Sequence, residues 1–129
     1  MANLDTKMAI LVVDDFATMR RIVSNMLNQL EFKNIDEAEN GAEALRKIEQ
    51  KQYDLLLVDW NMPKMSGLEL LSAARKMDNY KKTPIIMVTA EALKENILAA
   101  VQAGATGYVV KPFNAATLED KLKHAFRAS

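Results

Sequence analysis

The 129-residue chain contains no cysteine and a single histidine, His124. The absence of cysteine excludes disulfide bonds, thiolate metal sites and cysteine nucleophiles. His124 lies among charged residues late in the sequence, where we expect an exposed side chain, so it is a poor candidate for a metal ligand or a phosphoryl donor. Any reactive site in this chain therefore depends on carboxylate, hydroxyl, amide and ammonium groups.

The chain also lacks an excess of charge of one sign and a long apolar run. The 17 Lys and Arg residues balance 17 Asp and Glu residues, which argues against the basic surface that binds nucleic acid. The first apolar run, Met8–Val13, stops at two aspartates and is too short for a signal peptide or a membrane-spanning helix. We therefore expect a cytoplasmic protein that binds neither nucleic acid nor a membrane.

The composition that remains is that of a globular protein, with 50% hydrophobic and 26% charged residues. A length of 129 residues favours a single domain spanning residues 1–129, with no output domain on the chain. Short β-rich runs alternate with helical patterns, which predicts an α/β fold of the (βα)5 type with a doubly wound, five-stranded parallel sheet. The expected strands are Met8–Val13, Asn34–Ala38, Tyr53–Val58, Pro84–Val88 and Gly107–Val110.

Apolar residues at helical spacing predict five helices, one after each strand. The half-polar run Asn34–Ala38 is expected at an edge of the sheet. The expected apolar positions of the helices are Phe16, Met19, Ile22, Val23, Met26, Leu27 and Leu30, then Ala42, Leu45 and Ile48, then Leu68, Leu71 and Ala74, then Ile97, Leu98 and Val101, and finally Leu118, Leu122, Ala125 and Phe126.

Three of the expected strands end on charged residues: Asp14 and Asp15 follow the first, Asp59 the third and Lys111 the fifth. The carboxyl ends of parallel strands share one edge of the sheet, where such folds bind ligands. Two carboxylates ~5 Å apart repel each other by roughly 3 kcal/mol at an effective dielectric constant of ~20. Three carboxylates together therefore favour a bound cation, and oxygen ligands favour Mg²⁺.

Asp59 is a candidate nucleophile, because a carboxylate can attack a phosphoryl group and form an aspartyl phosphate. Thr89, at the end of the fourth strand, can donate a hydrogen bond to a phosphoryl oxygen, and Lys111 can pair with Asp59 and then with the phosphate. Each residue also has a simpler interpretation. Asp14 and Asp15 can cap the first helix, Asp59 and Thr89 can begin turns or caps, and Lys111 can be an ordinary solvated lysine.

Three other classes of function fit this pattern less well. A phosphatase of the haloacid dehalogenase class needs an acidic residue two positions after the nucleophile, where this chain has Asn61. A flavodoxin needs a phosphate-binding loop after the first strand, where Asp14 and Asp15 would repel a phosphate. The four glycines form no G-x-G-x-x-G motif, which argues against a dinucleotide-binding enzyme.

Four sequence runs resemble, in the same order, the receiver domains of two-component response regulators, and more narrowly the CheY family of single-domain chemotaxis regulators. The resemblance covers about residues 7–127 and implies the flavodoxin-like strand order 2-1-3-4-5. The runs are VVDDFATMRRIV (12–23), VDWNMPKMSGLELL (58–71), MVTAEALKENI (87–97) and AGATGYVVKPF (103–113).

The resemblance implies a role for each matching residue. Asp59 is the expected phosphoacceptor, and Mg²⁺ is expected on Asp14, Asp15, Asp59 and the backbone carbonyl of Asn61. Thr89 and Lys111 are expected to contact the phosphate, and the bond from Lys111 to Pro112 is expected to be cis. The remaining roles are those of Thr89 and Tyr108 as the switch pair, and of Asn61 and Glu91 as residues that tune the lifetime of the phosphate.

The resemblance also implies a phosphorylation-activated switch of bacterial chemotaxis. A histidine kinase resembling CheA is the expected phosphoryl donor, and a flagellar switch protein resembling FliM is the expected partner of the activated chain. The resemblance leaves open whether a dedicated phosphatase is a further partner. The chain is expected to be a monomer that catalyses only its own phosphorylation and dephosphorylation. The alternative is a stand-alone phosphorelay carrier that passes its phosphate to a histidine phosphotransfer protein, because the receiver chemistry is the same in both.

Overall fold

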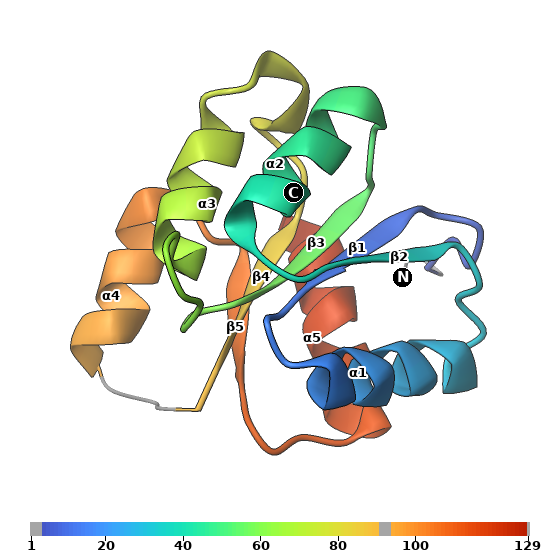
Figure 1. The fold of residues 1–129 in the computed structure, drawn as a ribbon. Coiled ribbons are helices and arrows are strands. Elements are labelled where there is room, and N and C mark those ends of the chain that lie inside the picture. Colours follow the sequence, from blue (N-terminus) through green and yellow to red (C-terminus); the bar gives the residue numbers. More distant parts are fainter. Residues whose placement is uncertain (1–3, 91–93, 129) are drawn as a thin grey trace.

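A five-stranded parallel sheet forms the centre of the molecule (Figure 1). The computed structural model describes residues 4–90 and 94–128. The strand order is β2-β1-β3-β4-β5, which confirms both the predicted fold class and the order implied by the family resemblance. The strands are β1 (Ile10–Val13), β2 (Ile35–Ala38), β3 (Leu55–Asp59), β4 (Ile85–Thr89) and β5 (Gly107–Val110).

Helices cover both faces of the sheet. Figure 1 shows α1 and α5 on one face, and α2, α3 and α4 on the other. No helix in residues 4–90 and 94–128 is both long and apolar enough to cross a membrane. The helices are α1 (Ala17–Gln29), α2 (Gly41–Gln50), α3 (Gly67–Arg75), the 3-10 turn η1 (Asp78–Tyr80), α4 (Lys94–Ala103) and α5 (Ala115–Ala128).

The strands alternate their side chains between two apolar clusters. In β1, Leu11 and Val13 pack with the α2–α4 face, whereas Ile10 and Val12 pack with the α1 and α5 face. Every residue of β1, β3 and β4 is buried, as expected for central strands that are covered on both faces. The edge strand β2 buries only Ala38 completely, so its predicted edge position is confirmed.

Local sequence signals explain where two of the helices begin. Asn40 accepts a hydrogen bond from the backbone N–H of Glu43 and so caps α2. Ser66 and Glu69 form a reciprocal capping box at the start of α3. This box fixes the direction in which the chain leaves the loop after β3, where the charged residues are found.

The predicted apolar stripes were wrong at several positions, which are exposed. Phe16 precedes α1 in an extended conformation, so it lies outside the helix whose stripe it was expected to join. In α4 only Ala100 is buried, because this helix covers the outer part of its face and turns one side to solvent. The exposed side chains are Phe16 (67%), Ile22 (42%), Leu98 (50%), Val101 (59%) and Ala42.

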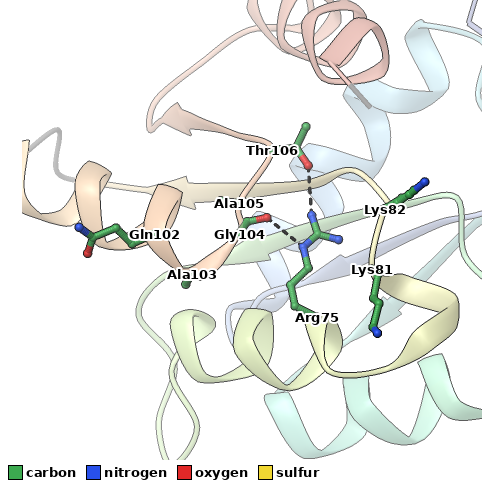
Figure 2. A pocket seen from close by; sticks show the side chains of 8 residues that line it. All are labelled: Arg75, Lys81, Lys82, Gln102, Ala103, Gly104, Ala105 and Thr106. Carbon is green, nitrogen blue, oxygen red and sulfur yellow. Dashed lines mark hydrogen bonds between the residues drawn. The ribbon is translucent and has the colours of Figure 1, made fainter.

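Arg75 joins several segments at the amino-terminal edge of the sheet (Figure 2). Its guanidinium group donates hydrogen bonds to the carbonyl oxygens of Gly104 (2.9 Å), Tyr80 (2.6 Å) and Thr83 (2.7 Å). A fourth bond, of 3.2 Å, reaches the hydroxyl of Thr106. Burial lowers the pKa of Arg75. The last turns of α3 and α4 are thereby tied to the entries of β4 and β5, at the edge opposite the charged strand ends.

Candidate functional site

Asp14 and Asp15 directly follow β1 and differ in their exposure. Asp14 is only 3% exposed, whereas Asp15 faces solvent. Oδ1 of Asp14 accepts a hydrogen bond of 2.9 Å from the backbone N–H of Phe16. Phe16 itself occupies the N-cap position of α1 and provides no side-chain cap, so the alternative that the two aspartates cap this helix is wrong. The second carboxylate oxygen of Asp14 faces Lys111, and the carboxylates of Asp14 and Asp15 lie in one cluster with that of Asp59.

Asp59 is the last residue of β3 and is only 5% exposed. The next residue, Trp60, donates its backbone N–H to Val88 of β4 at 2.8 Å, so the sheet fixes the chain on both sides of the carboxylate. Gly67 at the start of α3 approaches the same segment closely. A Cβ atom added at Gly67 would lie 2.2 Å from the carbonyl oxygen of Asp59. The start of α3 therefore packs directly against the backbone of Asp59, a contact that sequence reasoning missed although Gly67 directly follows the capping residue Ser66.

Lys111 directly follows β5, and its side chain reaches the end of β3 at the carboxyl edge of the sheet. Its Nζ atom lies 2.9 Å from Oδ1 of Asp59 and 3.4 Å from Oδ2 of Asp14. The backbone N–H of Lys111 donates a 2.7 Å hydrogen bond to the carbonyl oxygen of Thr89. The bond between Lys111 and Pro112 is cis, as the resemblance implies. The interpretation of Lys111 as an ordinary solvated lysine is therefore wrong.

The structure brings Asp14, Asp15, Asp59 and Lys111 together, and negative charge is in excess. Burial raises the pKa of Asp59; the hydrogen bond from Lys111 opposes this shift, while the charges of Asp14 and Asp15 reinforce it. Burial would lower the pKa of Lys111, but its hydrogen bond to Asp59 and the charges of Asp59 and Asp14 outweigh burial and raise it. Three carboxylates and one ammonium leave two negative charges when all four groups are ionised.

The carboxylate geometry fits a small divalent cation. One oxygen from each of Asp14, Asp15 and Asp59 lies within 4.8 Å of the others. Opposite ligands of an octahedral Mg²⁺ ion are about 4.2 Å apart, so small side-chain movements bring these oxygens to coordinating distance. The donors are hard oxygen atoms, which Mg²⁺ prefers, and the ion would balance the excess of two negative charges. The site is therefore compatible with divalent metal binding.

The other predicted site residues differ in how much of each side chain is exposed to solvent. Thr89 is the last residue of β4 and is buried, whereas Asn61 is exposed in the loop that follows β3. Tyr108 is half-buried in β5 and pairs in register with Met87 of β4. Glu91 lies outside the described residues.

Thr89 and Tyr108 line the same small cavity between the sheet and α4. Sequence reasoning did not identify the other walls of this cavity. No pattern in the sequence marks them, because they come from the loop after β3, from β4 and from α4. Its lining residues are Trp60, Met87, Thr89, Asn96, Ile97, Ala100 and Tyr108.

The family model for the response regulator receiver domain matches residues 10–123, which is most of the chain. The chain belongs to this family. Among curated proteins, the receiver domain is 50% identical over 125 residues to the chemotaxis protein CheY-3 of Vibrio cholerae, covering 97% of this chain and 96% of that protein. It is also 50% identical over 119 residues to the chemotaxis protein CheY of Pseudomonas aeruginosa, covering 92% and 96%. These relatives support the assignment to two-component signalling and chemotaxis.

Solved structures agree with the family and the fold. The receiver domain superposes on the chemotaxis protein CheY4 of Vibrio cholerae with a TM-score of 0.87 and 38% identity, covering 92% of this chain and 98% of that one. It also superposes on the receiver domain of the sensor histidine kinase PA1611 from Pseudomonas aeruginosa, with a TM-score of 0.83, 29% identity and coverage of 93% and 98%. The latter structure contains a magnesium ion coordinated in its active-site cleft.

Proposed function

We propose that this receiver domain accepts a phosphoryl group on Asp59 and thereby controls flagellar rotation in chemotaxis. The observation that supports this proposal most directly is the buried Asp59 carboxylate, which lies 2.9 Å from the Lys111 ammonium beside two further carboxylates. An oxygen atom of Asp59 attacks the phosphorus of a phosphohistidine on a kinase resembling CheA. A new P–O bond forms, the P–N bond breaks, and the imidazole leaves with the electron pair.

The surrounding residues make this transfer feasible between two anionic groups. The Lys111 ammonium forms ion pairs with both Asp59 and Asp14. After the transfer, the same ammonium can interact with the negatively charged phosphoryl oxygens on Asp59. Asp14, Asp15, Asp59 and the backbone carbonyl of Asn61 would hold Mg²⁺. When bound, the ion supplies screening of the repulsion between the attacking carboxylate and the phosphoryl oxygens.

Thr89 and Tyr108 transmit the effect of phosphorylation from Asp59 to the surface formed by α4, β5 and α5. The Thr89 hydroxyl donates to a phosphoryl oxygen and moves toward Asp59, and the Tyr108 ring then turns into the cavity that the two residues share. The surface formed by α4, β5 and α5 changes, and it binds a flagellar switch protein resembling FliM. Phosphorylation shifts the population between the two states only as far as its contacts differ between them.

The signal ends when water hydrolyses the aspartyl phosphate. Asn61 and Glu91 tune the lifetime of the phosphate, and a dedicated phosphatase is a further partner in this proposal. The protein then acts as a cytoplasmic, monomeric phosphoprotein that catalyses only its own phosphorylation and dephosphorylation. Nothing in this cycle requires nucleic acid or a membrane.

The direct test is labelling with acetyl phosphate and Mg²⁺, measured by intact-mass spectrometry. We expect one phosphoryl group per chain on a bond that is labile to base, and no such label in Asp59→Asn, because an amide is not a competent nucleophile. Asp120→Asn, which removes an exposed carboxylate of α5, is the matched control and should label normally. Label at the original rate in Asp59→Asn would refute the proposal.

A second measurement separates motor control from the phosphorelay alternative. The phosphorylated chain should bind a peptide from a flagellar switch protein more tightly than the unphosphorylated chain does. Transfer of the phosphate to a histidine phosphotransfer protein, without any gain in affinity for the switch peptide, would favour the phosphorelay carrier instead.

A further inference from the structure

A lysine of α5 lies over the ring of Tyr108. The Nζ atom of Lys121 is 4.9 Å from the centroid of this ring, within the range of a cation–π interaction. Both side chains are half-buried. Within residues 4–90 and 94–128, Lys121 forms no salt bridge, so the aromatic ring is the electron-rich group that its ammonium contacts.

This contact links the two helical layers around the edge of the sheet. Tyr108 packs with the cluster on the α2–α4 face, whereas Leu118 and Leu122 of α5 pack on the opposite face. In the described part of the chain, β5, which carries Tyr108, is the last strand at its side of the sheet. The Lys121 side chain therefore reaches past this edge to meet a ring that belongs to the other layer.

The position of the ring gives the contact a consequence for signalling. Tyr108 lines the cavity that it shares with Thr89, and it has the ammonium of Lys121 over its ring. A rotation of the ring that increases its distance from the ammonium weakens this attraction. The contact seen here therefore favours the present orientation of the ring over any orientation farther from Lys121.

We propose that Lys121 is a positioning residue that holds Tyr108 in its resting orientation and so sets how much of the unphosphorylated protein is already active. The proposal rests on the role of Tyr108 in the proposed function. A cation–π contact at a partly exposed site favours one state by about two- to fivefold. Loss of the ammonium should raise the inward population by that factor, and it should tighten the binding of a switch-protein peptide to unphosphorylated protein by about the same factor while that population is small.

Two variants of Lys121 separate its charge from its packing. Lys121→Met keeps an unbranched apolar stem and removes the cation, whereas Lys121→Arg keeps a cation that can also lie over an aromatic ring. Lys123→Met is the matched control, because it removes a half-buried lysine of the same helix that lines a different pocket with Leu4 and Glu119. Thermal unfolding of each variant checks that the fold is retained.

The first readout needs no partner. Three-bond NMR couplings that report the χ1 rotamers of Tyr108 are measured in unphosphorylated protein, with Tyr108→Phe used to assign the signals among the three tyrosines. We expect Lys121→Met to shift the rotamer populations, and Lys121→Arg and Lys123→Met to leave them close to those of the parent protein. Unchanged populations in Lys121→Met would overturn the proposal.

The second readout is a binding cycle with the switch-protein peptide. Lys121→Met should tighten binding in the parent background and have no such effect in a Tyr108→Leu background, because the ring through which it acts is absent. An equal effect in both backgrounds would mean that Lys121 acts on the peptide directly and would overturn the proposal.

Beryllofluoride, a phosphoryl analogue, keeps the two proposals apart. If it fails to change Tyr108 in the parent protein, the proposed switch fails, whereas the rotamer comparison in untreated protein still decides whether Lys121 holds the ring.

Discussion

The Nζ atom of Lys111 lies 2.9 Å from Oδ1 of Asp59, although 52 positions separate the two residues in the sequence. Asp59 ends β3 and Lys111 follows β5, so β4 lies between them in the sheet. The lysine side chain therefore extends across the end of β4, where Thr89 is buried. Carboxylate, hydroxyl and ammonium groups thus lie at the ends of three adjacent strands, and this arrangement underlies the predictions that follow.

Removal of the Asp59 charge should stabilise the metal-free protein at neutral pH. Because its native pKa is raised above the ordinary value of 3.8, mainly by burial, ionisation of Asp59 destabilises the native state. The free energy of unfolding of Asp59→Asn should therefore exceed that of the parent protein at pH 7. The difference should shrink as the pH falls through the raised native pKa and disappear below the unfolded value. Urea unfolding across this range measures it, and a less stable variant at pH 7 would contradict the prediction.

Mg²⁺ should change the fluorescence of Trp60, which is adjacent to Asp59, in a saturable titration. Asp15→Asn should weaken the apparent affinity by at least about tenfold, because a carboxylate ~4 Å from a cation contributes several kcal/mol even at an effective dielectric constant of ~20. Asp15 is exposed, so the variant should remain folded. Asp120→Asn should titrate like the parent protein, and an unchanged titration in Asp15→Asn would remove Asp15 from the metal site.

A methyl group at Gly67 should disturb the phosphoacceptor, whereas one at Gly107 should not. The added Cβ at Gly67 would lie 2.2 Å from the carbonyl oxygen of Asp59. At Gly107, by contrast, no atom of the described residues lies within 4 Å of the corresponding position, apart from those of the glycine and its two chain neighbours. We expect Gly67→Ala to lower the free energy of unfolding by about 1–3 kcal/mol and to slow acetyl phosphate labelling. Gly107→Ala is the control for the glycine substitution itself. Equal labelling rates in the two variants would show that close packing of α3 does not position Asp59.

Arg75→Met should destabilise the protein and leave the phosphorylation of Asp59 unchanged. The substitution removes the hydrogen bonds to Gly104, Tyr80, Thr83 and Thr106 and leaves partly buried carbonyl groups unpaired. The expected loss is about 2–4 kcal/mol in the free energy of unfolding. At a temperature where the variant is folded, Asp59 should label normally, because Arg75 lies at the opposite edge of the sheet. Lys76→Met, which removes a neighbouring exposed cation, should change stability far less.

The effects of Thr89→Ala and Tyr108→Ala on partner binding should not add. Both residues line one cavity, so they form one two-state element if the proposed switch is correct. Each variant should still take up phosphate on Asp59 and should lose most of the phosphate-driven gain in affinity for a switch-protein peptide. The double variant should bind within about 0.5 kcal/mol of the worse single variant. Full additivity in a titration calorimetry cycle would mean that the two residues act independently.

Several features of this protein followed from the sequence alone. The alternation of short β-rich runs with helical patterns predicted the parallel sheet, and the half-polar run at Asn34–Ala38 predicted its edge strand. Asp14, Asp59 and Lys111 could be placed at one edge because strand ends are visible locally, and parallel topology then brings them together. The cis bond before Pro112 came from the family resemblance instead, since no local pattern determines it.

The tertiary structure decided what depends on packing between distant segments. Phe16, which precedes α1, and Leu98 of α4 are apolar residues, but only the fold shows that both face solvent. Likewise, Gly67 lies against Asp59 and Lys121 lies over Tyr108 because α3 and α5 dock at particular positions. Periodicity specifies which face of an element is apolar, whereas a distance between side chains depends on how two elements pack. The residues that carry charge at the site were therefore evident in the sequence, and the residues that position them became evident only in the fold.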